Sequence, residues 1–205
     1  PSSGSFSTTT AASFSVDLSI GAQENVPIGD AVSAAERTEA AYSFQMDLTT
    51  SFTGEDSLDI SIDAGNAGGA TAEFDGNTGG DGLVVDGVAY TFPVGDATVF
   101  VGDNMDGSTL YSTACVYGGP SNTLDDCGNV NSALGGGSGT AAGASYDFGN
   151  GFTAAVGYTG DGSSTKGLLT KEGADAFGAQ VTYTADSFGI STTYANIETP
   201  TSTTD

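Results

Sequence analysis

Apolar and polar residues alternate one by one in nine short stretches of this chain. In FSVDLSI, residues 14–20, Phe14, Val16, Leu18 and Ile20 fall on one side and serine or aspartate on the other. Successive side chains of a β-strand point to opposite faces, so this period of two predicts strands with one apolar and one polar face. The nine candidate strands are residues 14–20, 42–48, 57–63, 83–92, 97–103, 141–148, 152–158, 177–183 and 188–194.

The polar side of the first three stretches carries aspartate at matching positions: Asp17, Asp47, Asp59 and Asp63. In residues 83–92 we expect four apolar residues, Val84, Val88, Tyr90 and Phe92, on one face. Asp86 has the same parity as Val84, so the face that it occupies is ambiguous.

Connections between the stretches alternate in length. Short turns at 53–56, 93–96, 149–151 and 185–187 alternate with long connections at 23–40, 66–82, 104–138 and 159–173. This pattern predicts an antiparallel up-and-down meander with tight turns at one end, a layout typical of outer-membrane barrels. Residues 23–40 are the one stretch compatible with a helix, with Asp30 as a candidate N-cap.

Aromatic residues recur at the ends of the candidate strands, on the apolar side. Aromatic side chains at both ends of the strands would form two girdles, one at each membrane–water interface. A soluble β-sandwich or a solenoid, in which apolar faces pack against each other, is the alternative. The residues are Tyr42, Tyr90, Phe92, Phe148, Phe152, Tyr158, Phe177, Tyr183, Phe188 and Tyr194.

The charge balance restricts the partners. Three basic residues stand against 26 acidic ones, giving a formal charge of −23. Three basic side chains are too few to neutralise the phosphates of a nucleic acid, which excludes nucleic-acid binding. A hydrophobic content of 38% argues against disorder, and no run of about 18 apolar residues predicts a transmembrane helix. The chain begins at Pro1 without a leader, which we interpret as a mature or trimmed chain.

Catalytic and metal chemistry have little support. The absence of histidine excludes Ser–His–Asp and Cys–His arrangements, and we expect no enzyme activity. DGNTGGD offers Asp75, Asn77 and Asp81 as oxygen ligands for a weak calcium site, although ordinary polar turn chemistry explains the motif more simply. We expect no other cofactor.

If the apolar faces meet lipid, five carboxylates point into a water-filled interior, where rings of aspartate favour cations. If the sheet is soluble, the same residues are solvent-exposed carboxylates of its outer face. The residues are Asp17, Asp47, Asp59, Asp63 and Asp86.

The 104–138 connection is longer than the loops that merely join two strands in a compact domain. We predict that it folds into the lumen as a constriction, with Asp125 and Asp126 between its two cysteines. Cys115 and Cys127 are expected to form a disulfide there in an oxidising compartment; two free thiols are the alternative.

Several segments, in order, resemble the cyanobacterial outer-membrane porins of the Som type, which are related to carbohydrate-selective porins, and in particular the marine picocyanobacterial members. The likeness runs from about residue 10 to 195. The segments are SFTGEDSLDISIDAGNAGG (51–69), DGLVVDGVAYTFPVGDATVFVGD (81–103), YSTACVYGGPSNTLDDCG (111–128) and YDFGNGFTAAVGY (146–158).

The resemblance implies one porin domain over residues 1–205, a portion of a longer transmembrane β-barrel in the cyanobacterial outer membrane. It also implies contact with outer-membrane lipid, a homotrimer, and passive diffusion of small hydrophilic solutes and inorganic ions. The acidic strands predict that cations are favoured. The alternative function is that of an extracellular structural or adhesive β-sandwich or a surface filament subunit.

Overall fold

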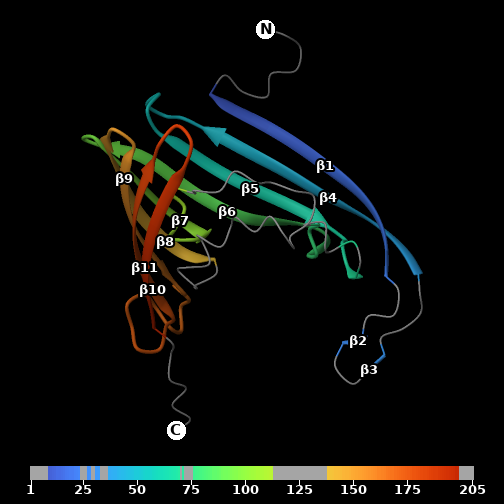
Figure 1. Cartoon of the computed structure of the whole chain (residues 1–205). Coiled ribbons are helices and arrows are strands. Elements are labelled where there is room, and N and C mark those ends of the chain that lie inside the picture. The colour runs from blue at the N-terminus through green and yellow to red at the C-terminus, as the bar shows by residue number, and fades with distance from the viewer. Residues whose placement is uncertain are drawn as a thin grey trace.

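The computed structural model describes residues 9–23, 27–28, 31–32, 37–69, 71, 76–112 and 138–198, and it is an all-β structure (Figure 1). Each of the nine predicted strands is confirmed, and several are longer than the alternating stretch that predicted them. The strands are β1 (Thr10–Gln23), β4 (Arg37–Thr50), β5 (Ser57–Gly65), β6 (Gly80–Val94), β7 (Ala97–Met105), β8 (Gly139–Gly149), β9 (Phe152–Gly160), β10 (Asp175–Thr184) and β11 (Gly189–Glu198). In the described part of the chain, no helix is long and apolar enough to cross a membrane.

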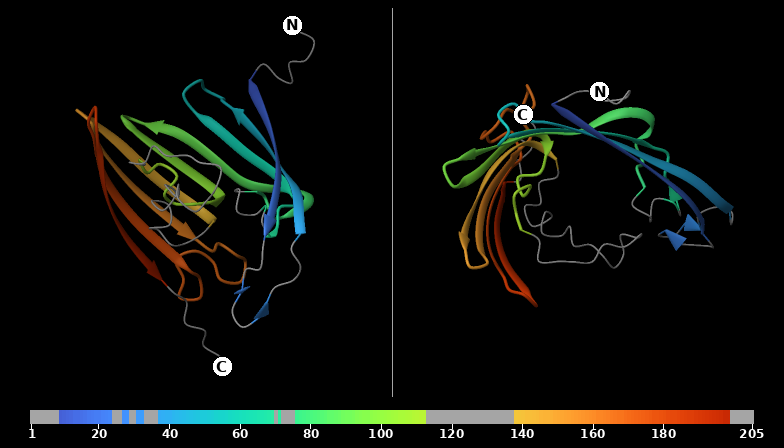
Figure 2. Two further views of the ribbon diagram at one scale, coloured as in Figure 1. Left: turned by 45° about the vertical axis from the view of Figure 1, so that its right-hand side comes forward. Right: turned by 90° about the horizontal axis from the view of Figure 1, so that it is seen from above.

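These strands form one antiparallel sheet in sequence order, β1-β4-β5-β6-β7-β8-β9-β10-β11, so the predicted up-and-down meander is confirmed. The short turns lie at the upper end of the sheet in Figure 1, and the strand ends that the long connections join lie toward the lower end. The sheet bends into an arc (Figure 2), and it is open, with β1 and β11 as its edges.

The candidate helix at 23–40 is wrong where the structure describes that stretch. β1 continues to Gln23, β4 begins at Arg37, and the strands β2 (Pro27–Ile28) and β3 (Ala31–Val32) pair between them. The β1–β4 ladder extends without interruption from Thr10↔Thr50 to Gln23↔Arg37. Tertiary strand pairing therefore overrides the helical propensity of an alanine-rich segment.

Strand register gives the sheet two chemically different faces. On one face, Asp59 lies beside Ala89 and Thr49. That row continues through Gly102, Ala141, Thr159 and Ala176. The neighbouring row on the other face runs Thr50, Leu58, Tyr90, Val101, Ala142, Tyr158 and Phe177. The predicted polar and apolar sides thus line up along these two rows, and one of the sheet's register shifts, a bulge in β6, reverses a predicted face.

The bulge lies between β5 and β6, where Ser61 pairs with Gly87 but Ile62 pairs with Val85, leaving Asp86 as the extra residue. Val84 consequently lies opposite Asp63 on the polar face. The expectation that Val84 shares a face with Val88 is therefore wrong, because one inserted residue reverses the alternation beyond it.

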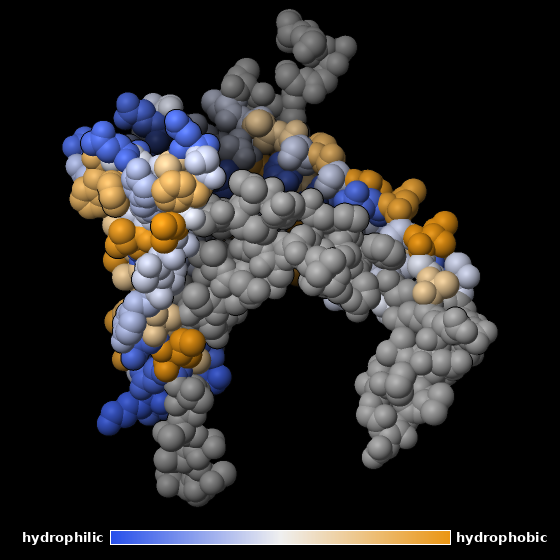
Figure 3. Space-filling view, viewed as in Figure 1, coloured by the Kyte–Doolittle hydropathy of each residue, from blue (hydrophilic) through white to orange (hydrophobic). Residues whose placement is uncertain are grey.

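The apolar face is the convex one, and its large side chains are exposed. Leu18 is 81% exposed and Ile20 is 73% exposed, and apolar residues stand along the outer surface of β1 at the upper right of Figure 3. The only other sheet among the described residues is the β2–β3 ribbon. The apolar face is thus not paired with a second described sheet, as a sandwich would require.

Aromatic rings form a row near the short turns. Phe52, Tyr90 and Phe92 lie in contact at the β4–β5 and β6–β7 turns, with ring centroids 5.4–6.2 Å apart. The row continues with three further contacts: Tyr146–Phe148, Phe152–Tyr183 and Tyr183–Phe188. At the opposite strand ends, Tyr158 and Phe177 pair at 5.0 Å.

Candidate functional site on the concave face

Four of the predicted carboxylates share the polar face of three adjacent strands. Asp17 lies opposite Ser43, and Asp47 lies opposite both Ser13 and Ser61. Asp59 and Asp63 lie opposite Thr49 and Gln45. β-Pairing therefore brings together residues that are up to 46 positions apart in sequence, as the difference between 17 and 63 shows.

Hydroxyl and amide groups orient two of these carboxylates, those of Asp47 and Asp59, along the sheet. Asp47 accepts hydrogen bonds from Ser61 Oγ at 2.6 Å and Gln45 Nε2 at 3.0 Å. Asp59 accepts from Thr49 Oγ1 and Ser57 Oγ, both at 2.7 Å. All these donors are neutral, so the carboxylates keep their negative charge available to a cation.

Asp86 joins this group through the bulge. Its side chain is exposed, and its carboxylate acts electrostatically on that of Asp63. Asn104, which has a φ of 54°, donates its side-chain amide to the backbone carbonyl of Asp86 at 2.5 Å. The bulge therefore holds Asp86 beside the carboxylate track formed by Asp17, Asp47, Asp59 and Asp63.

The chain after β7 turns inward and crosses the polar face of β9 and β10. Gly107 N donates to Thr159 Oγ1 at 2.7 Å, and Ser112 N donates to Gln180 Oε1 at 2.8 Å. Tyr111 packs against Ala155 and Ala176 in a buried cluster. Because all these strand partners belong to the polar face, residues 106–112, here called the inward segment, lie inside the arc (Figure 2).

Small residues make room for the inward segment. A Cβ added to Gly157 would lie 1.8 Å from the carbonyl oxygen of Gly107, and one added to Gly107 would lie 2.6 Å from the carbonyl oxygen of Tyr158. Only glycine permits backbones to approach this closely. The sequence analysis did not identify Gly107, Gly157, Thr159 and Gln180 as residues that position the inward segment. The signal that could have indicated such a contact was the run of small residues on the polar side of residues 141–158.

The two halves of the concave face therefore differ. Carboxylates line β1, β4, β5 and β6, whereas the described polar face of β8 to β10 carries mainly Gly, Ala, Ser, Thr and Gln beneath the inward segment. Asp147 is an exception near the short turn, where it accepts from Gly149 N. Lys166 and Lys171 both belong to the β9–β10 connection.

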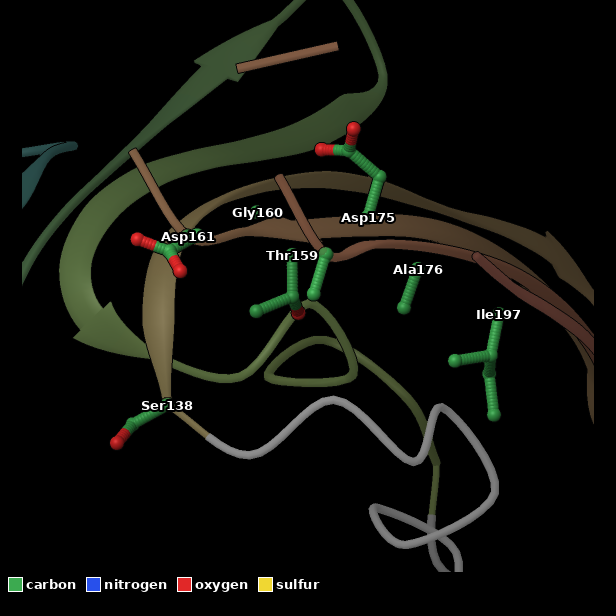
Figure 4. A pocket seen from close by; sticks show the side chains of 8 residues that line it. Ser138, Thr159, Gly160, Asp161, Asp175, Ala176 and Ile197 are labelled. Atoms are coloured by element: carbon green, nitrogen blue, oxygen red, sulfur yellow. The ribbon is translucent and has the colours of Figure 1, made fainter. Parts of the chain in front are cut away.

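A cavity of about 380 Å³ lies at the long-connection end of β9 to β11 (Figure 4). Thr159, Ala176 and Ile197 line it from the polar face, while the Asp175 carboxylate points away from them. At the edge of the cavity, Asp161 accepts a hydrogen bond from Lys166 Nζ at 2.7 Å. This salt bridge holds the pKa of Asp161 below its usual range. Since its polar side chains do not converge, the cavity does not define a ligand site.

The predicted calcium ligands have other partners where they are described. Asn77 donates its side-chain Nδ2 to the Phe44 carbonyl oxygen at 3.4 Å, and Asp81 accepts from the Tyr42 hydroxyl at 3.0 Å. Asp75 lies outside the described residues. Within the described ranges, no three His, Cys, Asp or Glu residues are grouped as a metal site would require, and weak calcium binding stays a prediction.

Cys115, Cys127, Asp125 and Asp126 also lie outside the described residues, so the disulfide and the acidic constriction loop stay predictions. No family model, curated protein or solved structure matches this chain.

Proposed function

We propose that this chain forms part of the wall of an outer-membrane β-barrel and allows small hydrophilic solutes and inorganic ions, cations preferentially, to diffuse passively across the membrane. The observation that carries the proposal is the contrast between the two faces: exposed large apolar side chains on the convex face and a carboxylate track on the concave one. The proposal needs no enzyme activity and no resident cofactor.

The distribution of charge on the convex face supports a membrane band. The carboxylates at convex-face positions are Asp81, Asp103, Asp175 and Glu198, and all belong to the long-connection ends of their strands. A charge near the bilayer midplane costs roughly 2–4 kcal/mol for a basic residue and less for an acidic one, so this placement keeps the lipid-facing band apolar.

Aromatic residues support the same orientation. The row from Phe52 to Phe188 lies beside the short turns, and the Tyr158–Phe177 pair lies at the other strand ends. Aromatic side chains suit the two membrane–water interfaces, because one part of the ring system meets lipid and the other meets polar groups. The resemblance to cyanobacterial Som-type porins agrees with this placement and adds the outer membrane and a homotrimer to the proposal.

Selectivity follows from the concave face. Asp47, Asp59 and Asp63 would raise the local concentration of cations in a water-filled lumen, more strongly at low salt. The inward segment supports the proposed constriction, because it carries residues 104–138 toward the interior of the arc at their start. Asp125 and Asp126 would then narrow and further charge the path.

Reconstitution into planar bilayers with a KCl gradient tests the proposal. We expect stepwise conductance and a reversal potential that favours cations. Silence from correctly folded protein would reject the function. The alternative, an extracellular structural or adhesive β-sandwich or filament subunit, predicts a chain that stays dispersed without detergent, whereas a porin requires detergent.

The constriction has its own test. Replacing Cys115→Ser and Cys127→Ser together should change single-channel conductance or selectivity if the disulfide shapes the loop. An unchanged channel would remove the disulfide-closed loop from the mechanism while leaving the pore itself in place.

A further inference from the structure

The β9–β10 connection, residues 161–174, packs against the convex face of the sheet at its long-connection end. Leu169 N donates to Asp175 Oδ1 at 3.3 Å. A Cβ added to Gly160 would lie 2.8 Å from both Asp175 Oδ1 and Leu168 Cδ2, so the Leu168 side chain also lies close to this carboxylate. The Asp175 carboxylate points away from the concave-face residues of the cavity (Figure 4), and Asp175 is only 2% exposed. The connection therefore covers this end of the convex face.

Two neighbouring leucines of the connection are exposed. Leu169 is 69% exposed and Leu168 is 41% exposed. The Tyr158 hydroxyl lies in the same place, because a Cβ on Gly160 would be 2.2 Å from it. The leucines therefore extend the apolar band at the level of the Tyr158–Phe177 ring pair.

Backbone geometry holds Leu169 in its exposed position. Its φ is 58°, in the left-handed region that bulky L-residues rarely adopt. Hydrogen bonds fix the turn before it, where Lys166 N and Gly167 N both donate to the Ser163 carbonyl oxygen, at 3.2 and 2.8 Å. Such backbone outliers persist where surrounding contacts hold them, and they cluster at ligand-binding and switch sites. The connection thus accepts strain while it presents an apolar side chain to the outside.

Both lysines of the chain flank the two leucines. Lys166 and Lys171 are exposed, and Lys166 Nζ pairs with Asp161 at 2.7 Å. Lys171 has no ion-pair partner among the described residues. Together with Asp161 and Glu172, the lysines give the connection a net charge of zero, two positive against two negative, in a chain of formal charge −23. Figure 3 shows hydrophilic and hydrophobic surface side by side at the lower left, over this end of β9 to β11.

We propose that this connection is a binding site for an anionic, phosphate-bearing lipid of the surrounding leaflet. Leu168 and Leu169 contact the acyl chains, and Lys171, with Lys166 beside it, binds the phosphate of the headgroup. The long apolar stem of lysine suits this position, because it lies along apolar surface while the ammonium group stays among polar groups. The inference rests on the proposed function, since it takes the convex face to be the one that meets lipid. It adds one ligand class and one site, whereas a uniform apolar band contacts every lipid alike.

The combination of leucines and lysines favours this occupant over others. A soluble phosphate would bind the lysines and leave both leucines in water. A zwitterionic lipid would cover the leucines, but its headgroup has no net charge for the lysines to attract. A second copy of the chain would bury the leucines without any need for a phosphate.

Native mass spectrometry of the natural full-length protein in neutral detergent tests the inference, with phosphatidylglycerol and phosphatidylcholine at equal concentration as probes. One variant, Lys166→Gln with Lys171→Gln, removes both charges, and a second, Lys166→Arg with Lys171→Arg, keeps them. A third variant, Leu168→Ser with Leu169→Ser, removes the apolar contact. Its matched control is Val94→Ser, at a 56% exposed residue beside the β6–β7 short turn.

We expect the wild type to retain phosphatidylglycerol in preference to phosphatidylcholine. The glutamine variant should bind phosphatidylglycerol at least about five-fold more weakly, the effect of one basic side chain at an anionic surface, and bind phosphatidylcholine as before. The arginine variant should match the wild type. The serine pair should bind both lipids more weakly, whereas Val94→Ser should not.

A wild type without preference for phosphatidylglycerol, or a glutamine variant with the same affinity as the wild type, would overturn the inference. Displacement of phosphatidylglycerol by inorganic phosphate at equal concentration would also overturn it and indicate a soluble-anion site. Loss of an oligomer in the serine pair, with lipid binding unchanged, would overturn it and indicate a second copy as the occupant.

Planar-bilayer recordings on the same samples separate this inference from the proposed function, because none of the substituted residues belongs to the carboxylate track. Normal conductance without a preference for phosphatidylglycerol would reject the lipid site and keep the pore. Preference for phosphatidylglycerol in a protein that gives no conductance would reject the pore and keep the lipid site.

Discussion

At the scale of single residues, Asp56 has the most concentrated set of hydrogen bonds in the described part of the chain. Its Oδ1 accepts from the backbone N–H groups of Phe52 and Thr53 and from the hydroxyls of Ser51 and Thr53, at 2.7–2.9 Å. Its Oδ2 accepts from the Tyr90 hydroxyl at 2.6 Å. One buried carboxylate thus connects the β4–β5 turn to β6 and to the aromatic row.

We expect Asp56→Asn to lower thermal stability measurably. The amide keeps one acceptor oxygen but replaces the acceptor of the Tyr90 bond with an NH₂ group and removes the charge that strengthens all these bonds. Thermal unfolding in detergent measures the effect. Asp96→Asn, at an exposed position of the β6–β7 turn, is the matched control and should leave the melting temperature within the scatter of repeats. Equal melting temperatures for both variants would contradict the role of Asp56.

The same carboxylate predicts an acid-sensitive turn. The hydrogen bond from Tyr90, followed by that from the Thr53 N–H, holds the pKa of Asp56 well below its usual range. A lowered folded-state pKa means that the stabilisation is complete above the unfolded pKa, about 4, and is lost as pH falls toward the lower folded-state pKa. The stability difference between the wild type and Asp56→Asn should therefore be constant from pH 5 to 7 and shrink below about pH 4. A difference that grows on acidification would refute this assignment.

At the scale of elements, the inward segment packs against β9 and β10, and the alternation of apolar and polar residues does not predict this contact. The segment depends on Gly157 for space and on Thr159 and Gln180 for hydrogen bonds. Since Gly157 lies in the middle of β9, its small size serves the contact with Gly107 rather than a turn.

Gly157→Ala should displace the inward segment and lower the free energy of unfolding by about 1–3 kcal/mol, the usual range for overpacking a tight contact. The added Cβ would collide with the Gly107 carbonyl, which is backbone and cannot rotate away. Urea unfolding in detergent measures the change. Gly82→Ala in β6 is the control, since a Cβ there meets nothing within 4 Å. Two variants with the same stability would show that the close approach does not matter.

At the scale of the whole molecule, the carboxylate track is expected to set ion preference. Asp47, Asp59 and Asp63 lie on the polar face of β4 and β5, and among described side chains both lysines belong to the β9–β10 connection, away from those strands. If this face lines a pore, its charge acts on every ion that passes within about a Debye length, roughly 10 Å at 0.1 M salt.

The triple variant Asp47→Asn, Asp59→Asn, Asp63→Asn should retain stepwise conductance and lose cation preference, with the K⁺/Cl⁻ permeability ratio falling toward one. Asparagine keeps hydrogen-bonding capacity and volume, so the change isolates charge. The control is the double variant Asp96→Asn, Asp186→Asn, at exposed residues of two short turns. Reversal potentials in KCl gradients at low and high salt measure the ratio. A triple variant as selective as the wild type would remove the track from the mechanism.

Much of the fold could be predicted from sequence because the relevant physics is local. The alternation in FSVDLSI and SLDISID predicted both strands and their faces, and turn residues such as those at 149–151 predicted tight antiparallel connections. The prediction failed at Val84 and at residues 23–40, where a bulge and a long β1–β4 ladder decided the outcome.

By itself, then, the sequence determined the all-β class, the antiparallel meander and the two-faced strands, because a period of two assigns each side chain to a face within its own strand. The tertiary structure alone decided that Asp86 joins Asp63, that Gly107 lies against Gly157, and that the sheet has two open edges. Each of these depends on register and on contacts between residues distant in the chain, which no local pattern encodes.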